Sequence, residues 1–579
     1  MVRKVAHDDS AMQDRTLQAN ARVLKNYRHK LFAKMTESVH RSFSDAEIQA
    51  SDGVGFLEDL TWMFKDLDRI ETDVKGLFPP DYGVWEFYVR VYHTRLNEAL
   101  TGVVKSNPEA RVLLKMHAWI KEYRGVMKEF EVPSSWLQPA LLDGKSQDLI
   151  EDYVQLIVDK FDKWTRNLML TETKEFTSRD APPEQDPDGT YALQFAMTMF
   201  QMANQQVDLA ADSGQGAVLS RVVVESARVM MACQAQWIKL VEREYTKQVE
   251  RPESTPPGLV EYVVALANDQ LKAADYAESM SNRLEPLVSA KYRTIISERL
   301  GTAIDGYLDV AKRCLQTLID LIFNDLKPVT RALFSQPGWY IDPLMDQIVE
   351  TMRDYTADYR GHLNPTLFDL LISDMLVRFL TTWLAALSRV PSRSLRIPAA
   401  PQRMEAEKKM MLSFFMEYQP VESSSSAPTT TTSNPMAEFE IIDTLISLLS
   451  ASPEMVLLDY WQFARQYGPN LSFIESILRG RDDLERPEVN EIIETIRRKV
   501  REEGLGEPDE ATIMTKVREM AGGSGGGYGL GGLGGSGAVG QVGQVAGGLL
   551  TSLTNRAAAY AGPLGVGGFA TGSTSGGMR

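Results

Sequence analysis

The chain has 579 residues, of which 62 are Lys or Arg and 78 are Asp or Glu, so its formal net charge is −16. Apolar residues make up 44% and charged residues 24%, as in proteins that fold around an apolar core, and the length allows about three to five folding units. The acidity excludes nucleic-acid binding by the molecule as a whole, and two cysteines, Cys233 and Cys314, exclude a disulfide framework.

In chain order, the first 41 residues are basic, with nine Lys or Arg against four Asp or Glu. We interpret this segment as the solvated face of a helix, with a contact to a partner or an anionic lipid as the alternative. No apolar run follows Met1, so no secretory signal is predicted. The longest uncharged stretch of the body, residues 189–207, carries five amide side chains, so no transmembrane segment is predicted either. These features predict a cytoplasmic protein.

Helical periodicity runs through nearly the whole body of the chain. Between residues 289 and 326 every step from one apolar residue to the next is three or four, which places them on one face of a single helix. The same holds between 343 and 363, and Asn364 is predicted to cap a further helix that ends at Leu387. Further helices are predicted over residues 21–41, 58–77, 84–100, 108–130, 147–176, 191–209, 217–249 and 259–284.

Strand signals are almost absent, and Asp188-Gly189 is predicted to precede a helix rather than to turn a hairpin. The predicted fold class is therefore all-α, built from many antiparallel helices joined by short turns. No fixed-period repeat supports a strict solenoid.

Four segments are predicted to be flexible. Residues 178–190 and 391–401 combine prolines with charge, and proline cannot donate the amide hydrogen bond that a helix needs. Residues 419–434 are a Ser/Thr tract, and the tail from 521 holds 22 of the 41 glycines, so neither can bury an apolar core. The resulting predicted domains are an N-terminal bundle (1–177), one or more middle bundles (191–390), a C-terminal bundle (402–520) interrupted by disordered residues 419–436, and a disordered tail (521–579).

The motifs that would indicate catalysis are incomplete. Gly144-Lys145-Ser146 has Pro139 where a phosphate-binding loop needs glycine, and the enzyme-like glycine motifs of the tail lack a strand–turn–helix context. The six histidines have no metal-ligand spacing, and His93 is predicted to be a packed, hydrogen-bonded core residue. Neither Asp482-Asp483 nor Asn268-Asp269 completes a magnesium motif of all-helical enzymes. We predict no catalytic, metal or cofactor-binding residue, and hence a scaffold.

Two features could carry function. One is a basic strip in the proline-rich connector, formed by Arg389, Arg393, Arg396 and Arg403. It is either a docking site for an acidic helix or lipid headgroup or a solvated linker. The other is the aromatic cluster Trp85, Phe87, Tyr88 and Tyr92, which we interpret as core rather than interface. The two cysteines lie on apolar helix faces and are predicted to pack in the core as well.

Three stretches resemble the exocyst complex component 3 family, whose members are subunits of the exocyst tethering complex. The first is Phe78-Pro79-Pro80-Asp81-Tyr82 with the aromatic residues that follow it, and the second starts at Val349-Glu350-Thr351-Met352 and continues to Phe368. The third is Ile477-Leu478-Arg479-Gly480 with Arg481-Asp482-Asp483-Leu484. Their order and spacing extend the resemblance over about residues 21–520. Relative to the family, the usual N-terminal coiled coil is not found.

The resemblance implies a rod of stacked helical bundles without enzymatic activity. It implies a role in tethering secretory vesicles to the plasma membrane before SNARE-mediated fusion. It also implies other exocyst subunits and SNARE proteins as partners and a location at sites of secretion. A separate hypothesis, from the basic residues before Arg41 or the strip from Arg389 to Arg403, is a peripheral contact with anionic membrane. The alternative hypotheses are a helical-repeat adaptor unrelated to secretion and an all-α metal-dependent enzyme.

Overall fold

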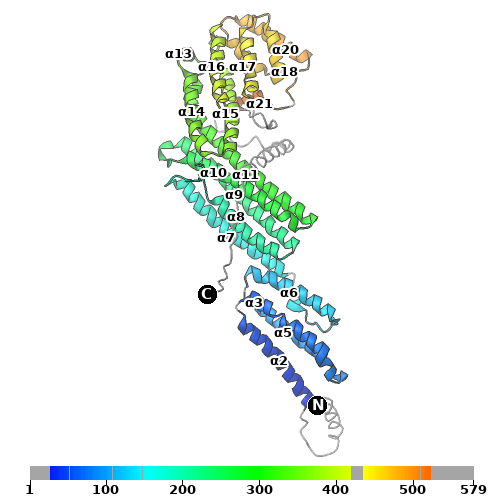
Figure 1. The fold of residues 1–579 in the computed structure, drawn as a ribbon. Helices are drawn as coiled ribbons and strands as arrows, with labels where there is room; N and C mark the ends of the chain where they lie inside the picture. The colour runs from blue at the N-terminus through cyan, green and yellow to red at the C-terminus, as the bar shows by residue number, and fades with distance from the viewer. Residues whose placement is uncertain are drawn as a thin grey trace, which may run out of the picture. The chain divides into compact units, whose positions relative to one another are not determined.

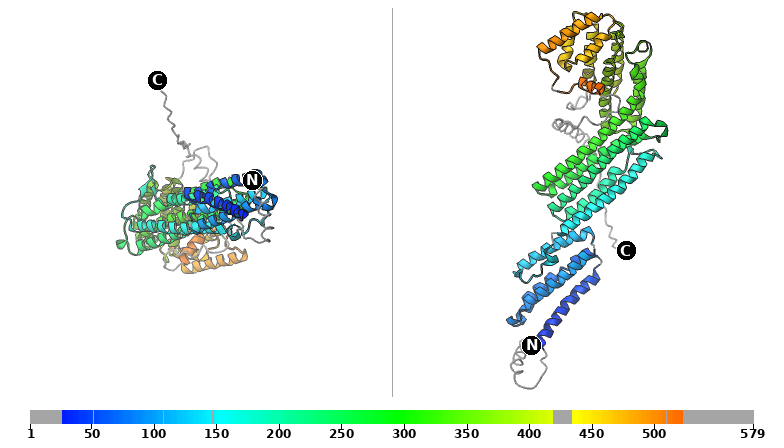
Figure 2. Two further views of the ribbon diagram at one scale, coloured as in Figure 1. Left: turned by 90° about the horizontal axis from the view of Figure 1, so that it is seen from below. Right: turned by 180° about the vertical axis from the view of Figure 1, so that it is seen from behind.

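The computed structural model describes residues 26–50, 52–106, 108–145, 148–418, 434–508 and 510–522. Within these ranges the secondary structure is helical except for one two-stranded hairpin and one isolated bridge, which confirms the all-α fold class (Figure 1, Figure 2). The predicted disordered segments 419–436 and 521–579 fall outside the described residues except at their edges. There, α17 begins at Pro435 and α21 ends at Gly522.

The chain divides into two compact units, each built from three stretches of sequence. The first unit comprises residues 1–172, 197–233 and 275–304, and the second comprises residues 173–196, 234–274 and 305–579. The three-bundle division of the sequence stays a prediction.

The first unit begins with helices that follow one another closely in the sequence. They are α2 (Tyr27–Gln49), α3 (Gly53–Asp59), α4 (Trp62–Arg69), α5 (Val84–Lys105) and α6 (Ala110–Glu129). Helix α2 packs against α5, where Phe43 contacts Tyr92 and Arg95 pairs with Glu47 at 2.8 Å. Figure 1 shows these two helices side by side.

The single helix predicted over residues 58–77 is wrong. The chain instead forms α3, α4, a π-helical turn (Ile70–Val74) and a 3₁₀ turn (Lys75–Leu77). A local cap explains the early start: Oδ1 of Asp52 accepts a 2.7 Å hydrogen bond from the amide of Gly55, so α3 begins upstream of the predicted helix. The apolar spacing survives the breaks, because Met63, Leu67 and Ile70 are all buried.

Five longer helices follow, and each contributes to both units. They are α7 (Asp148–Ser178), α8 (Phe195–Asp212), α9 (Gly216–Glu250), α10 (Leu259–Leu284) and α11 (Ala290–Asp325). Within the first unit, α9 runs parallel to α7, because Arg221 pairs with Glu151 and, two turns later, Arg228 pairs with Asp162. The apolar stripe predicted along α11 is confirmed, since its residues from Ile296 to Ile322 are buried.

In the second unit, the segment predicted to be a flexible loop at 178–190 is ordered. Strands β1 (Glu184–Gln185) and β2 (Tyr191–Ala192) pair antiparallel, so Asp188-Gly189 does turn a small hairpin. His362 holds the turn, because its ring stacks on Tyr191 at 4.2 Å between centroids and its Nδ1 lies 3.0 Å from the carbonyl oxygen of Gly189. The stabilising partner is about 170 residues away in the sequence, beyond the reach of a local pattern.

The remainder of the second unit is a group of shorter helices. They are α12 (Lys327–Ala332), α13 (Gly338–Ile341), α14 (Leu344–His362), α15 (Pro365–Leu387), α16 (Ala399–Met416), α17 (Pro435–Ser450), α18 (Val456–Tyr467), α19 (Leu471–Gly480), α20 (Arg486–Glu502) and α21 (Ile513–Gly522). The predicted cap of α15 is confirmed: Oδ1 of Asn364 accepts a 3.0 Å hydrogen bond from the amide of Thr366. Helix α15 lies at the centre, packed against α12, α14, α17 and α21.

Candidate functional site

The connector that carries the predicted arginine strip is not a flexible linker. Leu395 forms a parallel bridge with Arg481: the amide of Leu395 donates to the carbonyl of Gly480 at 2.8 Å, and the amide of Asp482 donates to the carbonyl of Leu395 at 3.0 Å. Arg393 donates its own amide to the carbonyl of Arg479 at 3.0 Å. The connector is not helical as far as Pro398, although α16 begins at Ala399 and includes Pro401. An extended segment can still form hydrogen bonds to another segment of the chain, so the prediction of flexibility is wrong.

Three of the four predicted arginines also contact other parts of the chain through their side chains. Arg393 donates to the carbonyl of Asp482 at 2.8 Å and pairs with Glu485 at 3.4 Å. Arg396 lies over the ring of Tyr340, 5.1 Å from its centroid. Arg403 pairs at 3.1 Å with the buried Glu407.

The four side chains therefore do not form one free basic patch. Arg389, Arg393 and Arg396 keep exposed surface, whereas Arg403 is half-buried in a structural network. That network includes Nε1 of Trp339, which donates to Oε1 of Glu407 at 2.8 Å.

The predicted core residues are confirmed. His93 is 2% exposed, with Nδ1 2.9 Å from the hydroxyl of Tyr123 and Nε2 2.8 Å from the carbonyl oxygen of Pro139. Cys233 and Cys314 are both buried, and burial raises the pKa of each thiol, that of Cys233 to about 12. In the aromatic cluster, Trp85 and Tyr92 are buried and their two neighbours are half-buried.

No cluster of three or more His, Cys, Asp or Glu side chains able to hold a metal ion occurs among the residues that the structure describes. Helix α15 is long and apolar enough to cross a membrane by length and composition, although no membrane segment is predicted from the sequence. However, 61% of its most apolar window is buried, and Leu371, Met375 and Leu384 are each at most 1% exposed, as in the central helix of a bundle.

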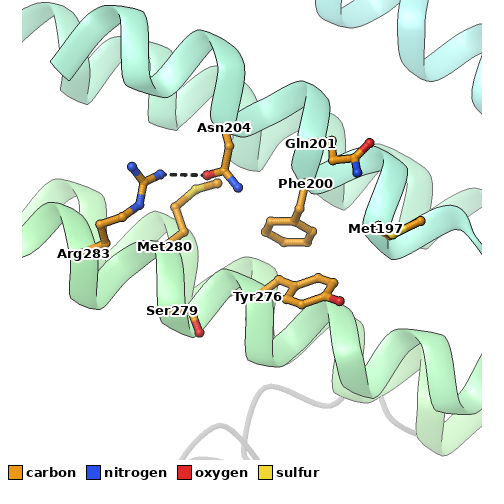
Figure 3. A pocket seen from close by; sticks show the side chains of 8 residues that line it. All are labelled: Met197, Phe200, Gln201, Asn204, Tyr276, Ser279, Met280 and Arg283. Carbon is orange, nitrogen blue, oxygen red and sulfur yellow. Dashed lines mark hydrogen bonds between the residues drawn. The ribbon is translucent and has the colours of Figure 1, made fainter. Parts of the chain in front are cut away.

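A groove between α8 and α10 in the first unit is a site that sequence reasoning missed. Figure 3 shows Phe200 and Tyr276 facing each other across it, with their ring centroids 5.5 Å apart. Phe200 and Met280 are buried and form its floor, whereas Met197 is 46% and Tyr276 is 40% exposed. At one end, Nη2 of Arg283 donates to Oδ1 of Asn204 at 2.7 Å.

The volume of the groove is about 270 Å³, below the roughly 300–1,000 Å³ of small-molecule sites. Helices α8 and α10 run parallel here, because Asn204 and Arg283 are each further along their helix than Phe200 and Tyr276. The sequence contains one hint of this site: Gln201 and Asn204, which line the groove, belong to the amide-rich stretch 189–207. In the sequence, the same amides only exclude a membrane span.

The described residues define an all-helical protein with a groove between α8 and α10 and exposed arginines on the connector before α16. Comparison with known proteins identifies the group. A family model described as "Exocyst complex component Sec6" matches residues 2–486. The chain belongs to this Sec6 family of exocyst components.

Individual relatives agree with the family match. The chain is 28% identical over 517 residues to "Exocyst complex component sec6" of Schizosaccharomyces pombe, which covers 88% of this chain and 66% of that protein. It is 29% identical over 492 residues to "Exocyst complex component SEC6" of Saccharomyces cerevisiae, covering 81% and 60%. "Exocyst complex component 3" of Drosophila melanogaster is 23% identical over 442 residues, covering 75% and 57%. The family resemblance is therefore confirmed, with Sec6 the better-supported name; the chain spans under two thirds of the length of these relatives.

Solved structures give the same result for the fold. The C-terminal domain of the exocyst subunit Sec6p is similar with a TM-score of 0.57 and 28% identity, covering 65% of this chain and 97% of that domain. M-Sec is similar with a TM-score of 0.54 and 14% identity, covering 85% of this chain and 82% of that structure, and shows the fold alone.

Proposed function

We propose that this chain is a non-enzymatic subunit of the exocyst complex, which tethers secretory vesicles to the plasma membrane before SNARE-mediated fusion. The observation that carries the proposal is the match of the Sec6 family model over residues 2–486, which runs through both compact units to the start of α20. Because the family model matches most of the chain, the similarity covers the helices of both units and does not rest on one short motif.

The proposed partners are other exocyst subunits and SNARE proteins, and the proposed location is the cytoplasm, with peripheral attachment at sites of secretion. Long helices supply extended surfaces for such contacts, as α9 with 35 residues and α11 with 36 illustrate. Specific pairing on such surfaces depends on a few well-packed anchor side chains within a larger contact area.

The test is affinity purification of the tagged full chain from its own cells, followed by quantitative mass spectrometry. We expect the other exocyst subunits to be enriched together relative to an equally expressed, tagged helical protein of similar charge. Depletion of the chain should also leave secretory vesicles accumulated beneath the plasma membrane. A purification that recovers the chain without any exocyst subunit would contradict the proposal.

The alternative of a helical-repeat adaptor is not favoured. Repeat proteins stack near-identical helix pairs, whereas the helices here range from 4 residues in α13 to 36 in α11. The third hypothesis, a metal-dependent enzyme, has no candidate ligand cluster within the described part of the chain.

For the arginine strip we propose a narrower role than the sequence suggested. The exposed parts of Arg389, Arg393 and Arg396 would contact an acidic partner or anionic lipid, while Arg403 supports the fold. Replacing both Arg389 and Arg396 by Glu should lower co-sedimentation with phosphatidylserine vesicles. The matched control replaces Arg498 and Lys499, exposed residues of α20, by Glu. Equal sedimentation of the two variants would end this proposal.

A further inference from the structure

The solvent-facing side of α7 in the first unit carries a row of cations. Lys160, Lys163 and Arg166 follow one another in steps of three residues. Phe161 and Thr165 are buried, and Lys163 is two residues from each of them, so its side chain leaves the helix on the side opposite the core. The side chains of the three cations form no ion pair or hydrogen bond with any residue that the structure describes.

The nearby acids do not neutralise this row. Asp162 pairs with Arg228 of α9, 2.8 Å away, on the edge of α7 that packs against that helix. Asp159, at the start of the row, accepts a 2.9 Å hydrogen bond from the side-chain amide of Gln155. Residues 160–170 thus present three cations, and their one acid is already paired.

An exposed leucine continues the row. Leu170 lies one turn after Arg166 and keeps 71% of its surface exposed. The apolar stems of lysine and arginine extend beside such a side chain while their charged ends reach outward. Together, residues 160–170 form a face roughly 15 Å long that is cationic and has one apolar side chain at its end.

We propose that this face of α7, from Lys160 to Leu170, contacts an anionic membrane surface. Lys160, Lys163 and Arg166 would lie at the lipid phosphates, and Leu170 would enter the boundary between headgroups and acyl chains. The inference deepens the proposed function and rests on it for the membrane that the chain meets in the cell. It adds a contact in the first unit to the one proposed for the arginine strip in the second.

The composition of the face favours a membrane over a protein partner. Protein interfaces are depleted in lysine at their centre and depend on anchor side chains packed in pockets, whereas this face is the outer side of a single helix. Anionic headgroups attract each Lys or Arg near their surface and require no matching shape. Three cations and one leucine give a weak, reversible attachment, as suits one contact among several.

A probe at position 170 tests the contact locally. Cys233 and Cys314 are buried, so an environment-sensitive fluorophore on the full-length Leu170→Cys variant labels that position selectively. We expect its emission to shift to the blue with vesicles of phosphatidylcholine and phosphatidylserine, and not with phosphatidylcholine alone. The control is Leu77→Cys, at a residue of the same unit that is 67% exposed, and its emission should stay unchanged. No shift at position 170 would overturn the proposal.

The charges have their own test. Lys163→Glu/Arg166→Glu should weaken binding of the full chain to the phosphatidylserine vesicles by about tenfold, because two attractive charges become repulsive. Both residues are exposed, so circular dichroism should stay unchanged. The matched control, Lys105→Glu/Arg299→Glu, makes the same charge change at exposed residues of α5 and α11 in the same unit. Equal losses in the two variants, or no loss in either, would overturn the proposal.

Two further outcomes are distinguishable. If vesicles leave the probe at position 170 unchanged but Lys163→Glu/Arg166→Glu loses exocyst subunits in affinity purification, the face binds an acidic protein and the membrane proposal is overturned. If the vesicle tests succeed but the wild-type chain recovers no exocyst subunits from cells, the membrane contact stands and the proposed function fails.

Discussion

Nη1 of Arg179 lies 3.2 Å from Oε2 of Glu244, and the two side chains are 0% and 1% exposed. Arg179 follows the last residue of α7, and its guanidinium also donates to the carbonyls of Phe176 and Pro256, at 2.8 and 3.2 Å. The pair thus fastens the end of α7 to α9 and to the turn before α10 inside the second unit.

Replacing Arg179 by Met should lower the free energy of unfolding by about 3 kcal/mol, because the change leaves the buried carboxylate of Glu244 without one of its partners. Urea unfolding followed by circular dichroism measures this. The matched variant is Arg221→Met, which removes an exposed ion pair to Glu151 and should cost about 1 kcal/mol or less. If both variants lost a similar amount of unfolding free energy, the buried pair would contribute no more to stability than the exposed pair, against this prediction.

Acid should destabilise the chain partly through His93. Burial lowers the pKa of His93 below its ordinary value of 6.5, against the opposing hydrogen bond to Pro139, so the unfolded chain takes up this proton more readily than the folded one. The contribution is therefore fully present above about pH 6.5 and is lost as the pH falls toward the folded pKa. His93→Gln should have a smaller loss of unfolding free energy between pH 7 and pH 5.5 than wild type, whereas His40→Gln on the exposed surface should keep the wild-type slope.

Two glycines of α11 should respond to alanine with opposite signs. A Cβ at Gly301 meets nothing within 4 Å, so Gly301→Ala should stabilise the chain by about 0.5–1 kcal/mol through helix propensity. A Cβ at Gly306 would lie 2.1 Å from Oε1 of the buried Gln234, so Gly306→Ala should destabilise the chain by about 1–2 kcal/mol.

A double variant tests whether α9 and α11 approach closely at Gln234 and Gly306. Adding Gln234→Ala to Gly306→Ala should restore part of the lost stability in thermal unfolding, because the side chain that the new methyl group meets is then gone. Purely additive effects of the two substitutions would contradict a contact at this position.

The amides of Leu395 and Asp482 should exchange slowly with deuterium, because both donate across the bridge between the connector and the end of α19. Gly480→Ala should speed their exchange by about tenfold, since its Cβ would lie 2.8 Å from Cγ1 of Val390 and 3.1 Å from Cδ1 of Leu395. Gly76→Ala, where a Cβ meets nothing within 4 Å, is the control. If these amides exchange fast in the wild-type protein, the connector is a flexible linker, as the sequence predicted, and the bridge is not formed.

Local patterns predicted most of the helices closely. The helix expected over 289–326 is α11 (Ala290–Asp325), and the one expected over 259–284 is α10 (Leu259–Leu284). Periodicity succeeds in these cases because an apolar stripe with steps of three and four over many turns fits a helix and does not fit a strand. It fails at residues 191–192, where a pattern continuous with α8 is interrupted by strand β2.

The candidate sites were harder to predict because they depend on distant pairs. Leu395 meets Gly480, and Gly189 meets His362, so neither the ordered connector nor the hairpin can be seen in a window of sequence. The groove is similar: Phe200 and Tyr276 look like ordinary apolar positions until α8 and α10 are placed side by side.

The central position of α15 has a consequence for the order of synthesis. This helix has the length and hydropathy of a membrane span, and its cover includes α21, which starts at Ile513, whereas α15 ends at Leu387. The ribosome must therefore add 135 residues, from residue 388 to the end of α21 at Gly522, before the cover is complete. At about 5–20 residues per second this takes roughly 7–27 s. During that interval the nascent chain carries an apolar helix that α12 and α14 cover first and α17 covers next, while its contact with α21 is still missing.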